Sequence, residues 1–110
     1  MTTINDSKEG KSNAILAYFT IIGCVIAIFM NMESKNKFAS FHIKQALGVH
    51  ILYFLILAVV SGFDSWLITF SFWIFVFILW IYGFIGALQG RETIVPLVGE
   101  YFQKWFDKLA

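Results

Sequence analysis

The segment from Trp66 to Leu88 constrains the fold more strongly than any other part of the chain. None of its twenty-three residues carries a charge, and fourteen of them are Leu, Ile, Phe or Val. A helix of this length crosses about 30 Å of hydrocarbon. Each such side chain favours insertion by about 0.3 to 0.6 kcal/mol, which sums to several kcal/mol. The segment is therefore predicted to be a transmembrane helix.

The whole chain has the composition of a membrane protein. It is 59% hydrophobic and 14% charged, whereas soluble domains have roughly 45–50% apolar and about 25% charged residues. Its thirteen Phe and four Trp residues exceed what the small interior of a 110-residue soluble domain could bury. A net charge of +1 and a sequence without nucleic-acid-binding motifs argue against a nucleic acid partner. Membrane lipid is the expected environment.

Two further spans are expected upstream. Residues 14–30 form an uncharged run of seventeen residues, and residues 44–61 form a second apolar helix that begins near the membrane surface. The long side chain of Lys44 can reach the lipid headgroups, so Lys44 is predicted to be a membrane-surface anchor. Residues 1–12 mix acids and bases without apolar periodicity and are expected to be a solvated N-terminal tail. Residues 13–110 then form a single helical membrane domain.

The chain after the third span is predicted to lie at the membrane surface. Pro96 cannot continue a preceding helix because it lacks a backbone N–H. Residues 97–109 place Leu97, Tyr101 and Trp105 on one face and charged residues on another, which is typical of an interfacial amphipathic helix. The predicted fold class is an all-α membrane protein with three transmembrane helices plus a C-terminal amphipathic interfacial helix.

The distribution of positive charge predicts the orientation. With three crossings, the connector after the first span and the C-terminal region share one side, and the N-terminal tail lies on the other. The positive-inside rule then places the N-terminus outside and the C-terminus in the cytoplasm, because the first side carries more positive residues. The residues counted are Lys35, Lys37, Arg91, Lys104 and Lys108 on the first side, and Lys8 and Lys11 on the second.

A polar stripe interrupts the second span. At 100° per residue, His42, Gln45, His50 and Tyr53 fall on one side of the helix, and Lys44 points largely the other way. Polar side chains at membrane depth normally face other helices or a watery cavity. The stripe either contacts a partner or lines a polar path, or it hydrogen-bonds to neighbouring helices of the same chain. These alternatives stay open at the level of the sequence.

The same region does not predict catalysis. His42 and His50 are about 12 Å apart along the helix axis, too far to share one metal ion. Asp64 and Glu92 are expected on opposite membrane faces and cannot form a catalytic carboxylate pair. No Ser has an evident base nearby. The chain is therefore predicted not to be an enzyme and to use no metal or other cofactor.

Small residues gather at the end of the third span. Gly83, Gly86 and Gly90 let another helix approach closely, and Gly23 with Ala27 offers a matching surface on the first span. These surfaces either pack within the chain or dock the helix of another chain. The full set of candidate helix-contact or partner-binding residues is His42, Gln45, His50, Tyr53, Gly83, Gly86, Gly90, Tyr101 and Trp105.

Two motifs resemble a known family. The sequence FHIKQAL at residues 41–47, supported by PLVG at residues 96–99, is similar to the Tic20-like family of small bacterial membrane proteins. The resemblance covers roughly residues 15–103. It implies a multi-pass protein of the bacterial inner membrane attached to a protein translocation apparatus, and it carries over no catalytic residues.

These observations favour a noncatalytic integral membrane subunit that associates with a larger complex. Its expected partners are membrane lipid and other membrane-protein subunits, with protein translocation or membrane-protein biogenesis machinery as the leading candidates. The alternative is a small self-assembling transporter or channel, in which His42, Gln45 and His50 line a polar path.

Overall fold

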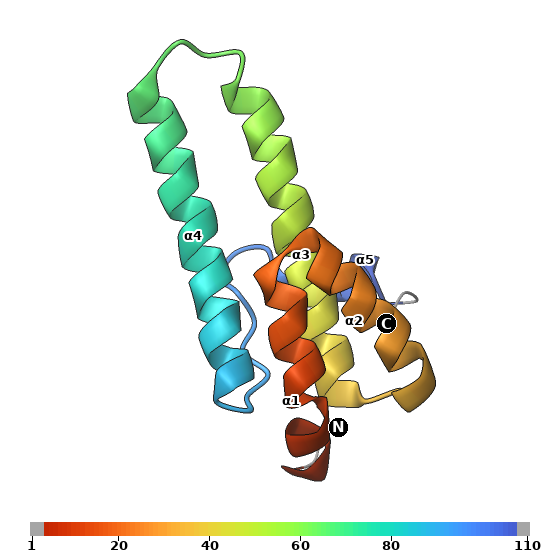
Figure 1. Ribbon diagram of the computed structural model, residues 1–110. Helices are drawn as coiled ribbons and strands as arrows, with labels where there is room; N and C mark the ends of the chain where they lie inside the picture. Colours follow the sequence, from red (N-terminus) through yellow and green to blue (C-terminus); the bar gives the residue numbers. More distant parts are fainter. Residues whose placement is uncertain (1–3, 108–110) are drawn as a thin grey trace.

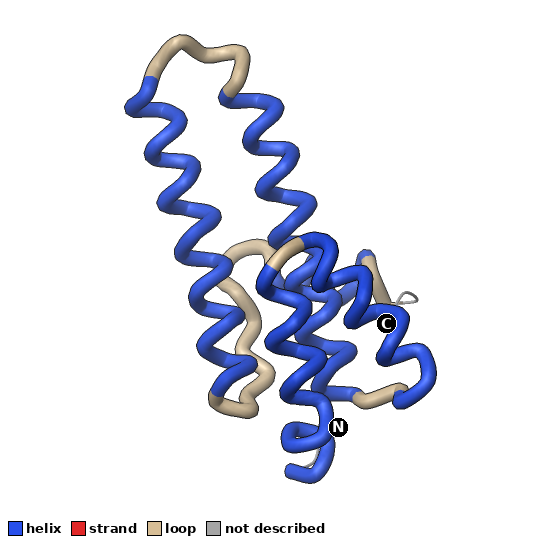
Figure 2. The backbone as a smooth tube through the Cα atoms, in the orientation of Figure 1, coloured by secondary structure: helices blue, strands red, loops and turns tan. Residues whose placement is uncertain are grey.

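The computed structural model describes residues 4–107, which form five helices and, within that range, no strand (Figures 1 and 2). The expected all-helical fold class is therefore confirmed. In chain order the helices are α1 (Ile4–Phe19), α2 (Ile21–Ser34), α3 (Lys37–Val60), α4 (Trp66–Leu88) and α5 (Gly99–Trp105).

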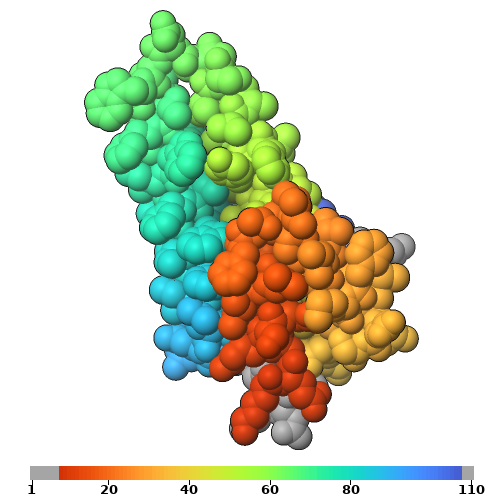
Figure 3. Space-filling model, in the orientation of Figure 1, coloured from red at the N-terminus to blue at the C-terminus, as the bar shows by residue number. Residues whose placement is uncertain are grey.

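The molecule has two parts of different thickness. Helices α3 and α4 form a long antiparallel hairpin, and α1, α2 and α5 gather around one end of it (Figure 1). We call the end where the helices meet the base, and the part of the hairpin beyond it, residues 51–75, the upper hairpin. The outline measures 48 × 23 × 22 Å, and Figure 3 shows the upper hairpin projecting from the base.

Helices α3 and α4 are the two described helices that are long and apolar enough to cross a membrane. Helix α4 coincides with the expected span at residues 66–88. Helix α3 contains most of the expected span at 44–61 but begins at Lys37, because the Asn36 side chain accepts the N–H of Ala39 at 2.9 Å and caps the helix start.

The expected first span is interrupted in the structure. Residues 14–30 do not form a single helix, because the backbone is extended at Thr20 (φ −150°, ψ 169°). The Thr20 hydroxyl accepts the N–H of Gly23 at 3.0 Å and caps α2. A Cβ at Gly23 would lie 2.5 Å from the Leu16 carbonyl oxygen, so glycine permits this close approach. The chain reverses here, and α1 packs against α2.

Neither α1 nor α2 matches the expected solvated tail followed by a single transmembrane helix. Helix α2 has 14 residues and is about 21 Å long, which is less than the hydrocarbon thickness of about 30 Å. Residues 4–12, expected to be part of a solvated tail, belong to α1, and Gly10 is buried there. Residues 1–3 lie outside the described part of the chain. The structure therefore does not confirm three transmembrane helices.

The connection from α2 to α3 is held by two buried asparagines. Asn31 accepts the backbone N–H of Asn36 at 3.0 Å and donates its side-chain amide to the Asn36 carbonyl at 3.2 Å. Between them, Lys35 adopts a left-handed conformation (φ 48°, ψ 41°) that ends α2. These reciprocal bonds satisfy polar groups that would otherwise be costly to bury. They position the start of α3 inside the base.

Helix α5 is shorter than the interfacial helix expected over residues 97–109. It covers Gly99–Trp105, and residues 108–110 lie outside the described chain. Its buried residue Phe102 packs directly on Gly48 of α3, where a Cβ would come within 2.2 Å of the ring. The Gln103 side chain donates to the Phe41 carbonyl at 2.9 Å. Helix α5 is therefore part of the base.

The outer surface of the molecule is strongly apolar. Large side chains such as Phe29 on α2, Leu55 on α3 and Trp66 on α4 are more than half exposed. Contiguous apolar surface of this kind is rare on soluble monomers and is expected where lipid covers the protein. The interior of the base is formed instead by small and aromatic residues, including Ala14, Ala17, Tyr18 and Phe38.

Candidate functional site

A closed group of polar side chains lies inside the base. His42 and Gln45 on α3 are fully buried, and both contact Tyr18 of α1. They also contact the loop segment 91–95 that follows α4. We call Tyr18, His42 and Gln45, with the backbone of residues 91–95, the polar cluster. It joins elements that are 24 to 50 positions apart in the sequence.

The direction of each hydrogen bond follows from the chemistry of its partners. His42 Nε2 lies 2.7 Å from the Arg91 carbonyl oxygen, which can only accept, so Nε2 carries the proton. The Tyr18 hydroxyl lies 2.8 Å from His42 Nδ1, and its oxygen accepts the Gln45 amide N–H at 2.9 Å. Tyr18 therefore donates to Nδ1. This arrangement assigns a neutral imidazole with one defined tautomer.

Gln45 completes the group by fixing segment 91–95. Its amide nitrogen also donates to the Thr93 carbonyl at 2.9 Å, and its oxygen accepts the N–H of Val95 at 2.8 Å. The Gln45 amide thus supplies hydrogen-bond partners to backbone groups of a segment that belongs to no helix or strand. The Gln45 side-chain amide makes three hydrogen bonds in all. They offset the free-energy cost of burying this polar group.

Glycines on α4 make room for the polar cluster. A Cβ at Gly83 would lie 2.7 Å from the Tyr18 hydroxyl oxygen and 3.0 Å from Gln45 Nε2. A Cβ at Gly86 would lie 2.0 Å from Thr93 Oγ1. Gly90 has φ 71° just after the end of α4, a conformation that favours glycine. The glycine patch predicted from the sequence therefore lies against α1 and segment 91–95 of the same chain.

The other predicted site residues lie apart from the polar cluster. His50 is half-buried, and its Nε2 lies 2.9 Å from the Ala17 carbonyl. The Tyr53 ring packs edge-on against Trp73 at 5.8 Å between centroids, in the upper hairpin. Tyr101 and Trp105 are exposed on α5, with their rings 5.5 Å apart. The structure thus brings together His42, Gln45, Gly83 and Gly86.

Lys44, predicted to be a membrane-surface anchor, forms an ion pair with Asp107. Its ammonium lies 3.8 Å from the carboxylate of Asp107, which is largely exposed, and its own side chain is mostly covered. An exposed pair of this kind contributes little to stability, about 0 to 1 kcal/mol. The pair does place Lys44 beside α5 at the outer edge of the base.

Sequence reasoning missed the partners of the polar residues. Tyr18 lies in the uncharged run 14–30 that is predicted to be a span, yet its hydroxyl is the centre of the polar cluster. The Trp80 indole N–H donates to the Tyr18 carbonyl and ties α4 to α1. The carbonyls of Arg91 and Thr93 act through the backbone, which no side-chain pattern could reveal.

The side chains of the polar cluster are engaged in hydrogen bonds within the base. The side chains of the polar cluster bond to one another and to the backbone inside the base, so none is presented to a ligand. Among the side chains described, those of residues 8–107, no group of three or more His, Cys, Asp or Glu could hold a metal ion. The described residues define a small all-helical protein with two helices apolar enough to cross a membrane and a hydrogen-bonded polar interior.

Comparison with known families identifies the chain further. A family model matches residues 9–102, which include all of α2, α3 and α4. The chain belongs to the MamF/MmsF family, described as the magnetosome magnetite crystal formation protein family. No curated protein and no solved structure matches it.

This membership corrects the expectations drawn from the sequence. The resemblance to the Tic20-like family was wrong, and so was the function in protein translocation that it implied. The channel alternative is unsupported as well, since His42 and Gln45 are buried and bonded within the chain. Two of the residues that suggested the resemblance, His42 and Gln45, bond to the segment 91–95 within the base.

Proposed function

We propose that the chain is a noncatalytic, two-pass protein of the magnetosome membrane that takes part in magnetite crystal formation. The family description supports the process, and the geometry supports a structural role within the membrane. One observation carries the membrane arrangement, namely the distribution of charge along α3 and α4. Between Lys44 and Arg91 the sequence has a single charged residue, Asp64, and it lies in the turn between the two helices.

This distribution supports two spans with the base on the cytoplasmic side. All eight Lys and Arg residues precede Gln45 or follow Gly90. With two spans, both ends of the chain and the connector between α2 and α3 share one side, and the turn at residues 61–65 faces the other. The positive-inside rule favours this orientation more strongly than the expected three-span arrangement, because every positive residue is then cytoplasmic. The proposed arrangement therefore has the N-terminus in the cytoplasm, whereas the three-span prediction has it outside.

Helices α1 and α2 fit this arrangement as a re-entrant hairpin that enters and leaves from the cytoplasmic side. Their turn lies partway along the α3–α4 hairpin (Figure 1), and Phe19 at the end of α1 lines the same groove as His50 and Trp80. The outward face of α2 is apolar and exposed, so lipid would cover it. Its exposed large side chains include Ile22, Val25, Ile26, Phe29 and Met30.

A structural role follows from the closed interior. The polar cluster is buried and internally bonded, which supports a packing function over catalysis. Exposed aromatic side chains on α5, Tyr101 and Trp105, lie on the base and suit the membrane interface, where aromatic residues are enriched. The base would thereby present a rigid surface at the cytoplasmic face to lipid and to other subunits of the magnetosome membrane.

Gene replacement in the bacterium that carries this chain tests the proposal. Crystal dimensions are measured by electron microscopy after deletion of the gene and after complementation with the wild type, with Gln45→Leu, or with Gln89→Leu. Wild type and Gln89→Leu should restore the original crystals, because Gln89 is exposed, whereas Gln45→Leu should not, because the base cannot close. Unchanged crystals in the deletion strain would contradict the proposal.

A further inference from the structure

An aromatic stripe runs along α4 from end to end. Large aromatic residues recur at alternating spacings of four and three, which places them on one face of a helix. The residues of this aromatic stripe are Trp66, Phe70, Trp73, Phe77, Trp80 and Phe84.

The lower end of the aromatic stripe is covered by α1. The Trp80 indole N–H donates to the Tyr18 carbonyl, and the Phe84 ring lies 6.3 Å from the Tyr18 ring and 5.9 Å from the Phe19 ring. Helix α1 ends at Phe19. Beyond that point the stripe residues are more than half exposed, with Trp66 at 75%, Phe70 at 55%, Trp73 at 52% and Phe77 at 56%.

A groove begins where α1 ends. It has a volume of about 320 Å³ and is lined by α3 residues such as Val49 and Tyr53, by the stripe residues Trp73 and Phe77, and by Phe19. A flexible hydrocarbon chain can enter this groove and meet apolar walls.

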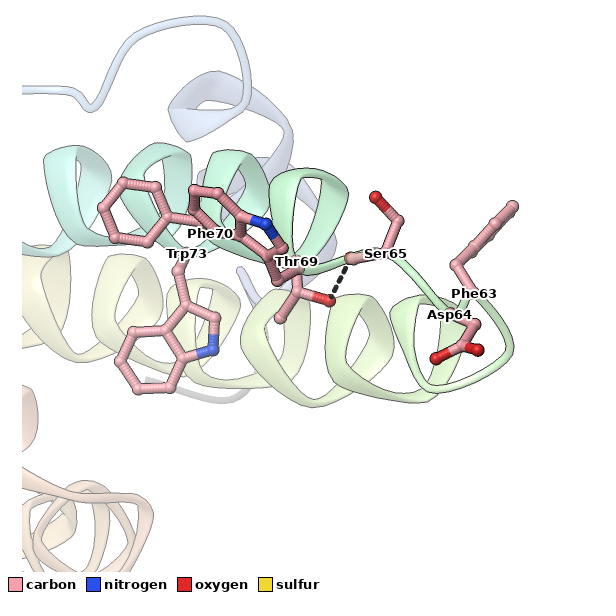
Figure 4. Close-up of a pocket in the computed structure, with 7 residues that line it drawn as sticks. Phe63, Asp64, Ser65, Thr69, Phe70 and Trp73 are labelled. Atoms are coloured by element: carbon pink, nitrogen blue, oxygen red, sulfur yellow. Dashed lines mark hydrogen bonds between the residues drawn. The ribbon is translucent and has the colours of Figure 1, made fainter.

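A second hollow lies at the turn between α3 and α4 and shares Trp73 with the groove. It has a volume of about 500 Å³ and is lined by Phe63, Asp64, Ser65, Trp66, Thr69, Phe70 and Trp73. Figure 4 shows these side chains on the turn and the first turns of α4, where the Thr69 hydroxyl donates to the Ser65 carbonyl at 3.2 Å. From Trp66 to Phe77 the stripe rises about 16 Å, close to the thickness of one lipid leaflet.

Asp64 gives the upper hollow a charge preference. It is the only charged residue between Lys44 and Arg91, and aromatic rings line the hollow around it. An ammonium group is attracted both by a carboxylate and by the faces of aromatic rings. An anionic headgroup at the same place would be repelled. The charge therefore complements a lipid that carries an amine.

We propose that the aromatic stripe binds a phospholipid with an ammonium headgroup in the leaflet opposite the base. The ammonium lies at Asp64 among the aromatic rings, and one acyl chain follows the stripe past Trp73 into the groove that ends at Phe19. This inference rests on the two-pass insertion proposed above.

Native mass spectrometry of the full chain, released from detergent, tests the inference. The probes are phosphatidylethanolamine and phosphatidylglycerol with identical acyl chains. The wild type should retain phosphatidylethanolamine about fivefold better, in line with the roughly 1 kcal/mol of an ammonium–aromatic contact at an exposed site. Asp64→Asn should reduce the preference to less than about twofold, and Trp73→Ala should weaken retention of both lipids, because Trp73 lines both hollows.

Two control variants carry matched changes away from the stripe. Glu33→Gln neutralises an exposed carboxylate in the base, and Ile74→Ala shortens an exposed side chain that is outside the stripe on α4. Both should keep the wild-type preference, and circular dichroism should show the same helix content in all variants. Equal retention of the two lipids by the wild type, or an unchanged preference in Asp64→Asn, would overturn the inference.

Two further readouts separate the competing outcomes. Efficient disulfide formation between copies carrying Phe70→Cys in a Cys24→Ala background would show that a second chain covers the stripe, and would also overturn the inference. Carbonate extraction of membranes from the expressing cells tests insertion itself. A chain released by carbonate contradicts the proposed membrane function, whereas an inserted chain without lipid preference contradicts the lipid site alone.

Discussion

The base and the upper hairpin differ in how their side chains are packed and exposed. In the base, the buried side chains of Tyr18, His42 and Gln45 are hydrogen-bonded, and glycines let the elements approach closely. In the upper hairpin, α3 and α4 carry large exposed apolar side chains, and no described helix covers their outer faces. Specific packing is therefore concentrated in the base, whereas the apolar side chains of the upper hairpin face outward, toward lipid in the proposed two-pass arrangement.

The largest expected effect comes from Gln45→Leu. The change leaves the Val95 N–H, the Thr93 carbonyl and the Tyr18 hydroxyl without their buried partner. At about 1 to 3 kcal/mol for each unsatisfied group, and with partial relaxation, unfolding in detergent should become easier by about 3 to 5 kcal/mol. Denaturant titration followed by circular dichroism measures this loss.

The control for this change is Gln89→Leu, which makes the same substitution at an exposed position after α4. It should alter the free energy of unfolding by less than about 0.5 kcal/mol. Similar losses in the two variants would mean that Gln45 is not the centre of the base.

A smaller loss is expected from Gly83→Ala. The new methyl group would lie 2.7 Å from the Tyr18 hydroxyl oxygen, so the polar cluster must shift. Overpacking of this kind costs about 1 to 3 kcal/mol. Gly62→Ala in the turn of the upper hairpin is the matched change, because a Cβ there meets only the Val59 carbonyl oxygen at 3.5 Å. Thermal unfolding should separate the two variants, and equal melting temperatures would refute the comparison.

Tyr18→Phe should have a milder effect of about 1 to 2 kcal/mol, since it removes one hydroxyl and leaves His42 Nδ1 without a donor. Tyr82→Phe removes a hydroxyl from an exposed ring on α4 and should be nearly neutral. The imidazole tautomer provides a second readout. Nitrogen NMR should find the proton on His42 Nε2 in the wild type, and a proton on Nδ1 alone would contradict the assigned bond directions.

The sequence predicted the long helices well and the base poorly. The predicted span at residues 66–88 coincides with α4, because turn residues bound this uniform apolar run at both ends. Helical periodicity placed His42 and Gln45 on the same side of α3. The break at Thr20 was missed, since hydropathy is continuous across residues 14–30 and the capping bond to Gly23 is local. The partners of His42 could not be predicted, because Tyr18 lies 24 positions away and the Arg91 partner is a backbone carbonyl.

The smallest effect is expected in the upper hairpin. Leu55→Ala removes an exposed side chain of α3, and lipid or detergent can occupy the space. The free energy of unfolding should change by less than about 0.5 kcal/mol, as for other exposed positions. Denaturant titration alongside Gln45→Leu gives the direct comparison. A loss above about 2 kcal/mol would show that another protein surface, and not solvent or lipid, covers Leu55.

Labelling of single cysteines in intact membranes tests the two-pass arrangement most directly. In a Cys24→Ala background, Lys8→Cys, Gly62→Cys and Lys104→Cys report on α1, the turn of the upper hairpin and α5. An impermeant maleimide applied from the side opposite the cytoplasm should label Gly62→Cys alone, and Lys8→Cys and Lys104→Cys should react only after the membrane is opened. Labelling of Lys8→Cys together with Gly62→Cys would contradict the shared cytoplasmic base and favour three spans.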